Sequence, residues 1–309
     1  MNESIIIETK NLTKYYNKIR GIENLDLKIL KGEIFGLLGP NGAGKTTTIR
    51  VLLDLIRKTS GEAFIFGLDC HENSAEILQR VAYLPGELGL YKEKTARKNL
   101  DILLGMYKKP IPRRRIEELA ERLRLNLNRK VEELSKGNKQ KVGIILALAP
   151  EVDLLIADEP TSGLDPLIMS EFYKILYEQQ KENETTALLS SHRLEEVERV
   201  AHRVGVIREG NIIELATVEK LKKLALKEVI IEFTNQKDLF EFKKKNPEYS
   251  EESRKNGLKE TQIVFHVARN KLKNLLISLS QEDLRDLDIV SPALEELFLK
   301  YYEQKEDVK

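Results

Sequence analysis

The sequence has little cysteine, almost no excess charge and no long apolar run, and each shortage excludes a class of protein. The single cysteine, Cys70, rules out an internal disulfide framework and favours a reducing compartment. The 51 basic and 50 acidic side chains nearly cancel, so a general attraction to nucleic acid or anionic lipid is not expected. No uncharged apolar stretch reaches the roughly 18 residues of a membrane-spanning helix, and the first residues lack a secretory-signal pattern. We therefore expect a soluble intracellular protein.

The chain does contain enough apolar material for a core, with 41% hydrophobic residues in a length of 309 that suggests about two domains. In its first two-thirds, short apolar runs alternate with amphipathic runs, which predicts an α/β fold with a largely parallel sheet. A helix is expected over 45–56 and a hairpin over 203–214, turning at residues 209–211. The predicted strands are 5–8, 25–29, 33–38, 81–84, 152–157 and 185–190.

The composition changes after about residue 220. Segments rich in lysine and glutamate separate the predicted strands 228–233 and 261–268, and Ser291-Pro292 is a favourable helix start. Apolar residues then recur at helical spacing, at Leu294, Leu297, Phe298 and Tyr301. We predict a first domain over residues 1–224 and a small α+β accessory domain over 225–309.

Residues 39–46 fit the phosphate-binding motif G-x-x-x-x-G-K-[ST]. Glycines let backbone N–H groups turn around phosphate oxygens, and the helix that follows directs its positive end at the same anion. Lys45 is expected to reach the β- and γ-phosphates, and the Thr46 hydroxyl to hold Mg²⁺. The candidate nucleotide-binding residues here are Gly39, Pro40, Asn41, Gly42, Ala43, Gly44, Lys45, Thr46 and the adjacent Thr47.

Two acids end the predicted strand 152–157, and ligands bind at the carboxyl ends of parallel strands. Asp158 is therefore expected to face the magnesium shell, and Glu159 the attacking water. His192 follows another strand of the buried type, which places it at the same edge of the sheet, within reach of a γ-phosphate. A purely structural histidine is the simpler alternative.

Leu134, Ser135, Lys136, Gly137 and Asn138 resemble the Leu-Ser-Gly-Gly-Gln signature of the ATP-binding cassette (ABC) subunits of transporters. The signature lies about 20 residues before the acidic strand, as in that family. The resemblance covers residues 4–225, and the ending at 291–298 is similar to the appendix of many bacterial exporter ATPases.

The resemblance implies a P-loop NTPase cassette, with a mixed-sheet core and a helical subdomain at about 88–150. It also implies the cofactors ATP and Mg²⁺, with Lys45, Glu159 and His192 catalytic, and Thr46 and Asp158 as magnesium ligands. The further nucleotide-binding residues that it implies are Tyr16, which stacks on adenine, Ser135, Gly137 and Asn138 of the signature, and Asp165 of the aspartate loop 162–165.

The same resemblance implies partners. Each ATP would lie between the phosphate loop of one cassette and the signature of a second, in a pair that closes on itself. A separate membrane-spanning permease would dock near residues 83–104 and receive the motion, so the chain would sit on the cytoplasmic face of the membrane and power export. The transported substrate, the permease and the choice between homodimer and heterodimer stay open.

Two departures from the family pattern stand out. Lys136 and Asn138 replace glycine and glutamine in the signature, and we expect a working variant. Gly86 stands where the family has a glutamine that contacts magnesium, and Glu87 is a candidate oxygen ligand in its place. The basic run 113–115 is typical of a solvated surface.

Two other functions are less consistent with the sequence. A soluble mechanical ATPase acting on ribosomes or DNA usually carries two cassettes or a long coiled coil, whereas the chain has one phosphate loop and no room for a coiled coil between Tyr91 and Leu134. A P-loop kinase would not need the signature or the aspartate loop. No nucleic-acid partner is expected.

Overall fold

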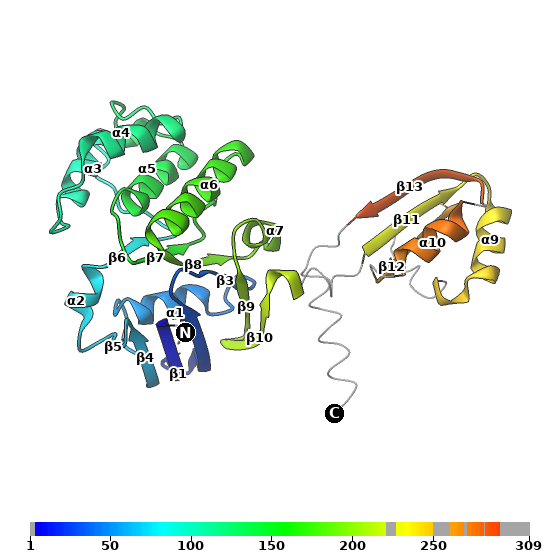
Figure 1. Cartoon of the computed structure of the whole chain (residues 1–309), viewed down its shortest axis with the longest axis horizontal. Coiled ribbons are helices and arrows are strands. Elements are labelled where there is room, and N and C mark those ends of the chain that lie inside the picture. Colours follow the sequence, from blue (N-terminus) through cyan, green and yellow to red (C-terminus); the bar gives the residue numbers. More distant parts are fainter. Residues whose placement is uncertain (1–3, 221–226, 250–259, 269–270, 281, 291–309) are drawn as a thin grey trace. The chain divides into compact units, whose positions relative to one another are not determined.

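The computed structural model describes residues 4–220, 227–249, 260–268, 271–280 and 282–290. The chain divides into two compact units, Met1–Val218 and Glu219–Lys309, and each is described by itself (Figure 1). The predicted boundary between residues 224 and 225 falls outside the described residues. Within the described part, no helix combines the length and the apolar character needed to cross a membrane.

A six-stranded mixed sheet forms the centre of the first unit, in the order β10-β9-β3-β8-β7-β6. The five strands of this sheet from β9 to β6 run parallel to one another, and β10 pairs antiparallel with β9. The strands are β3 (Ile34–Leu38), β6 (Val81–Leu84), β7 (Leu154–Asp158), β8 (Thr186–Ser191), β9 (Arg203–Arg208) and β10 (Asn211–Thr217). Most of their residues are buried because layers cover both faces, which explains why the sequence shows continuous apolar runs.

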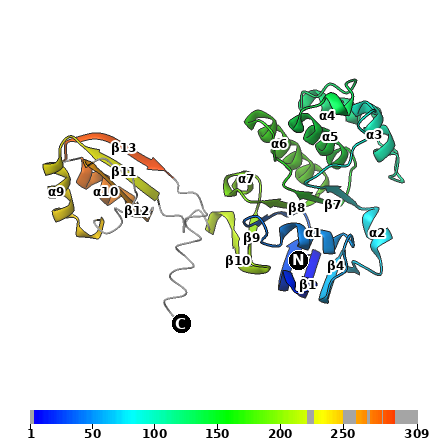
Figure 2. The same cartoon turned by 180° about the vertical axis from the view of Figure 1, so that it is seen from behind.

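A second, antiparallel sheet, β2-β1-β4-β5, faces one side of the first. Helix α1 (Lys45–Leu52) lies between the two sheets (Figure 2). Its residues Ile49 and Leu52 share one core with Ile156 of β7 and Leu188 of β8. The strands of this sheet are β1 (Ile5–Tyr16), β2 (Ile19–Leu30), β4 (Ser60–Ile65) and β5 (Leu68–Asp69), and the short helix α2 (Ser74–Leu78) follows them.

Helices cover the other face of the central sheet. Alternate residues of β7, Leu155 and Ala157, point into this second core together with residues of the helices. The elements are α3 (Ala96–Leu104), α4 (Arg113–Arg122), the 3₁₀ turn η1 (Val131–Glu133), α5 (Lys136–Leu148) and α6 (Pro166–Asn183). Helix α7 (Leu194–Glu198) follows β8.

The predicted elements of this unit are confirmed in type, but the strand predicted over 5–8 continues to Tyr16 and the one predicted over 25–29 begins at Ile19. The helix expected over 45–56 ends at Leu52 because Asp54 has a φ of 54°, outside the helical region. The hairpin turns on Glu209 and Gly210 alone, which both have positive φ, and Asn211 already pairs with Arg208.

The second unit contains a three-stranded antiparallel sheet in the order β12-β11-β13. Its core includes Val229, Ile231, Phe242, Phe265 and Leu275, so the α+β character expected from the sequence is confirmed over the described residues. The elements are β11 (Lys227–Phe233), α9 (Gln236–Lys245), the 3₁₀ turn η2 (Pro247–Tyr249), β12 (Gln262–Val267), α10 (Leu272–Leu279) and β13 (Leu284–Val290). The helix expected after Ser291 lies outside the described residues.

Candidate functional site

The phosphate-loop motif forms an open turn between β3 and α1. Gly42 and Gly44 have φ values of 80° and 110°, which glycine adopts without strain. A Cβ on Gly44 would lie 2.7 Å from the carbonyl oxygen of Gly21, whereas nothing stands within 4 Å of the Cβ position of Gly42. The loop is therefore packed against Gly21 at Gly44, and it leaves open space beside Gly42. Because the first turn of α1 contains no acidic residue, its N–H groups are suited to an anion.

The Lys45 side chain lies across this loop and is only 6% exposed. Its Nζ donates to the carbonyl oxygens of Gly39, at 2.6 Å, and Pro40, at 3.1 Å. The same Nζ lies 3.3 Å from Oε1 of Glu159. Lys45 thus brings a cation to the point where the phosphate loop meets the end of β7.

Asp158, at the end of β7, faces the start of α1. Its Oδ2 accepts a hydrogen bond from the Thr46 hydroxyl at 2.7 Å, and its Oδ1 accepts one from Ser190 of β8 at 2.5 Å. The carboxylate and the hydroxyl are hard oxygen ligands of the kind that Mg²⁺ prefers. The two residues predicted to hold magnesium therefore lie in direct contact, and their donor set fits this ion.

Glu159 has a φ of 50°, an unusual value for a residue with a side chain. Its Oε2 lies 2.8 Å from Nδ1 of His192, and its backbone N–H donates to the Ser190 hydroxyl at 2.9 Å. Its Oε1 is buried and has no hydrogen-bond partner within the described part of the chain. The Lys45 ammonium, 3.3 Å away, offsets the charge of this oxygen, and its hydrogen-bonding capacity is left for a ligand or a water molecule. Lys45, Glu159 and His192, which are far apart in the sequence, thus meet at one edge of the sheet.

The signature lies at the start of α5. The Ser135 hydroxyl caps this helix by accepting the N–H of Asn138 at 3.3 Å. Gly137 packs so closely on the aspartate loop that a Cβ there would stand 2.7 Å from the carbonyl oxygen of Gly163. Among the hydrogen bonds and ion pairs of residues 4–220, none joins residues 134–138 to the phosphate loop. The signature and the phosphate loop therefore form two separate groups within one chain.

The remaining predicted contacts lie near these groups. Asp165 caps α6, with Oδ1 accepting the N–H groups of Leu167 and Ile168 at 3.1 and 3.0 Å. Tyr16, at the end of β1, is 40% exposed. A Cβ on Gly21 would meet both the Tyr16 ring and the Thr47 methyl group at 3.0 Å, so Tyr16 lies beside the phosphate loop.

Gly86, which stands where the family has a glutamine, lies beside Asp158. A Cβ on Gly86 would lie 3.6 Å from the backbone oxygen of Asp158 and 3.8 Å from its Oδ2. Glu87, the candidate substitute, is exposed. The side-chain position that faces Asp158 is thus that of Gly86, and the assignment of Glu87 stays a prediction.

Two polar residues of this region are not predicted by any motif of the sequence. Ser190 binds both Asp158 and Glu159, and Glu196 binds the residues around His192. Ser190 could have been found from the sequence, because the pair Ser190-Ser191 is polar and stands at the carboxyl end of an otherwise apolar strand. Glu196 lies among other glutamates of a charged segment, which gives no such signal.

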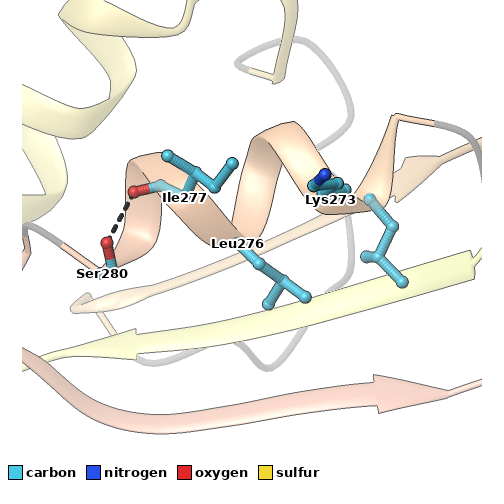
Figure 3. A pocket seen from close by; sticks show the side chains of 5 residues that line it. Lys273, Leu276, Ile277 and Ser280 are labelled. Carbon is cyan, nitrogen blue, oxygen red and sulfur yellow. Dashed lines mark hydrogen bonds between the residues drawn. The ribbon is translucent and has the colours of Figure 1, made fainter.

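A shallow pocket on the second unit has a different character. Its volume is about 520 Å³, and it lies along α10, between Leu272 and Ser280 (Figure 3). Its lining is largely apolar, with Leu276 and Ile277 exposed and Lys273 as its charged residue. This pocket lacks the clustered acids and cations found around Lys45.

Comparisons with known proteins agree with this geometry. Residues 22–162 match the family model described as ABC transporter. The bacitracin transport ATP-binding protein BcrA of Bacillus licheniformis is 35% identical over 303 residues, which cover 96% of this chain and 97% of that protein. The chain belongs to the ATP-binding proteins of ABC transporters. The BcrA protein of Enterococcus faecalis is 38% identical over 220 residues, 71% of each chain.

The fold of this ABC protein is also that of solved cassettes. A bacterial ABC transporter cassette solved as a dimer is 25% identical, with a TM-score of 0.63, covering 69% of this chain and 99% of that one. The chain is thus an ATP-binding subunit of an ABC transporter and an ATPase, as the resemblance implied. The family model and these relatives all concern transporters, so they give no support to action on ribosomes or DNA.

Proposed function

We propose that this ABC ATPase powers export through a separate membrane-spanning permease, with ATP and Mg²⁺ held between two cassettes. The match to a bacitracin transport protein supports a role in transport, and it extends over 96% of the chain, so it includes most of the second unit. Bacitracin is accordingly the first substrate to test. The permease would dock near residues 83–104, where Tyr91 is 51% exposed, and the subunit would sit on the cytoplasmic face of the membrane.

Thr46 and Asp158 are the residues that would hold Mg²⁺, whose charge would offset that of the phosphates. One carboxylate and one hydroxyl suit an ion that keeps several water ligands and also binds phosphate oxygens. Gly39–Thr47 would bind the phosphates, and Tyr16 would stack on the adenine.

Glu159 would orient and deprotonate the attacking water, and the observation that carries this assignment is its set of contacts. One carboxylate oxygen faces Lys45 at 3.3 Å without a hydrogen bond, and the other lies 2.8 Å from His192. Lys45 would balance charge on the transferred phosphoryl group, and His192 would hold the carboxylate and contact the γ-phosphate.

A second cassette would complete each site. The signature and Asp165 have no hydrogen bond or ion pair to the phosphate loop of their own chain within residues 4–220, which leaves the signature available to a second copy. The solved dimer of a similar cassette is consistent with such a pair. ATP would draw the two cassettes together, and hydrolysis would let them separate.

The Glu159→Gln variant tests the hydrolytic assignment. We expect it to bind ATP with near-native affinity and to lose most of its turnover, because an amide cannot accept the proton of water. Steady-state phosphate release and nucleotide binding, measured on the same preparation, separate the two effects. Hydrolysis at the native rate would show that Glu159 is not the base.

Export can be tested in cells. Cells that express the chain with its co-purifying membrane polypeptide should become less susceptible to bacitracin, and the Glu159→Gln variant should not protect them. Equal susceptibility with the native and the variant chain would reject bacitracin export.

A further inference from the structure

One carboxylate joins the loop that carries His192 to the loop that follows Glu159. Glu196 lies in α7 and is 7% exposed. Its Oε2 accepts hydrogen bonds from the hydroxyls of Thr161, at 2.9 Å, and Ser191, at 2.8 Å. Both of these residues are 3% exposed. Because a buried polar group left without its partner is costly, a movement of either loop away from Glu196 is opposed.

Glu196 also holds the residue on the other side of His192. Arg193 donates its backbone N–H to the Ser191 hydroxyl oxygen at 2.9 Å, and its Nη1 lies 3.3 Å from Oε1 of Glu196. Both neighbours of His192 in the chain are therefore tied to one carboxylate. His192 itself contacts Glu159.

The helix that carries Glu196 is held firmly against the central sheet. The Val197 side chain occupies the space over Gly36 of β3, where a Cβ would meet it at 2.0 Å. Val197 is 2% exposed, so α7 lies directly on the strand that leads into the phosphate loop. Glu196 thus extends from a fixed support toward the two loops.

We propose that Glu196 is a positioning residue for ATP hydrolysis, which keeps His192 and Glu159 at contact distance. Thr161 is two residues after Glu159, and Ser191 is one residue before His192, so the carboxylate closes a ring of contacts through both. This inference rests on the proposed roles of Glu159 and His192. Lys45 meets this ring at Glu159 but donates its hydrogen bonds to the carbonyl oxygens of Gly39 and Pro40 in the phosphate loop. Loss of Glu196 therefore affects turnover rather than ATP binding.

The first test compares Glu196→Ala with Glu195→Ala in the full-length chain. Glu195 is the matched control because it is the neighbouring residue of α7, with a side chain 77% exposed. We expect Glu196→Ala to lower kcat by about tenfold to a hundredfold, since small misplacements of catalytic groups have effects of this size. The Kd for ATP should stay within about twofold of native, and Glu195→Ala should change neither quantity. A native kcat in Glu196→Ala would overturn the inference.

A double-mutant cycle with His192→Ala separates positioning from a general structural role. If Glu196 acts through His192, adding Glu196→Ala to the His192→Ala chain should lower kcat by less than about twofold more. Losses that multiply would overturn the inference. Should Glu196→Ala fail to fold, Thr161→Val and Ser191→Ala each remove one donor and carry the same test: each should lower kcat in the native chain but not in His192→Ala. Native turnover in Glu159→Gln would instead reject the proposed function itself.

Discussion

We propose that nucleotide binding depends strongly on Lys45, because its buried ammonium lies along the phosphate loop. Lys45→Ala should weaken ATP binding by at least about tenfold, as expected when a charge-assisted hydrogen bond of about 2 kcal/mol is lost. Lys58→Ala is a suitable control because Lys58 pairs with Asp69, outside the loop. Equilibrium binding of a fluorescent ATP analogue measures both variants, and equal affinities would contradict the assignment.

Glu87 gives a second residue-scale prediction. If Glu87 is a magnesium ligand, Glu87→Ala should raise the Mg²⁺ concentration needed for half-maximal ATPase activity. Gly86→Gln should lower it in either case, because the side-chain position of Gly86 faces Asp158. An unchanged magnesium titration of Glu87→Ala, beside a shifted one for Gly86→Gln, would remove Glu87 from the metal site.

The sequence predicted residues whose chemistry is fixed by a local motif, and it missed residues whose role depends on contacts through space. Lys45 and Thr46 follow from their spacing to the glycines, and Asp158 from its place at a strand end. Glu196 could not be found in this way, because Glu195 and Glu198 lie in the same short segment and only its burial distinguishes Glu196 from Glu195.

At the scale of elements, the contact between α7 and β3 can be tested through Gly36. Gly36→Ala should lower the free energy of unfolding by about 2 kcal/mol, because the new methyl group would collide with Val197 in a packed core. Gly89→Ala is the matched control, since nothing stands within 4 Å of its Cβ position. Urea denaturation measures both, and equal stability of the two variants would show that α7 does not pack closely on β3.

Helices α4 and α6 of the first unit are joined by ion pairs. Arg122 of α4 pairs with Glu171 and Glu178 of α6 at 2.5 and 2.6 Å. The hydrogen bond from Arg122 holds the pKa of Glu178 below its usual range. A lowered pKa means that this stabilisation is present above the pKa of the unfolded chain and is lost as the pH falls through the folded pKa.

Arg122→Met should accordingly lower the free energy of unfolding by about 1 kcal/mol at neutral pH, a size usual for partly exposed ion pairs. The difference from the native chain should shrink as the pH falls through the folded pKa of Glu178. Arg114→Met is the control, because Arg114 is 89% exposed and pairs within its own helix. Denaturation curves over a pH series check this, and a difference that does not depend on pH would contradict it.

Element types were predictable because the central sheet is covered on both faces, so its strands appear as short apolar runs. The ends of elements were less predictable. The periodicity of 45–56 continues past the turn at Asp54, since Ile56 still packs against the same core although the helix has ended. The spacing of apolar residues indicates which side chains are buried, but it does not predict the backbone angle at which a helix ends.

At the scale of the whole molecule, the first unit carries both proposed halves of an ATP site without joining them. The phosphate loop, Asp158, Glu159 and His192 form one group, and the signature with the aspartate loop forms another. The sequence predicted this division only through its resemblance to a family, because no local pattern says that two half-sites belong to different copies.

The most direct test of whether ATP joins two cassettes is the mass of the Glu159→Gln chain in solution. Sedimentation velocity measures this mass with and without Mg-ATP. We expect a monomer without nucleotide and with ADP, and a dimer of twice the 35.5 kDa chain mass when ATP is bound but cannot be hydrolysed. Adding Ser135→Arg, which places a bulky side chain in the signature, should abolish the dimer while ATP binding persists. A chain that stays monomeric at saturating Mg-ATP, even with its membrane partner supplied, would contradict the account.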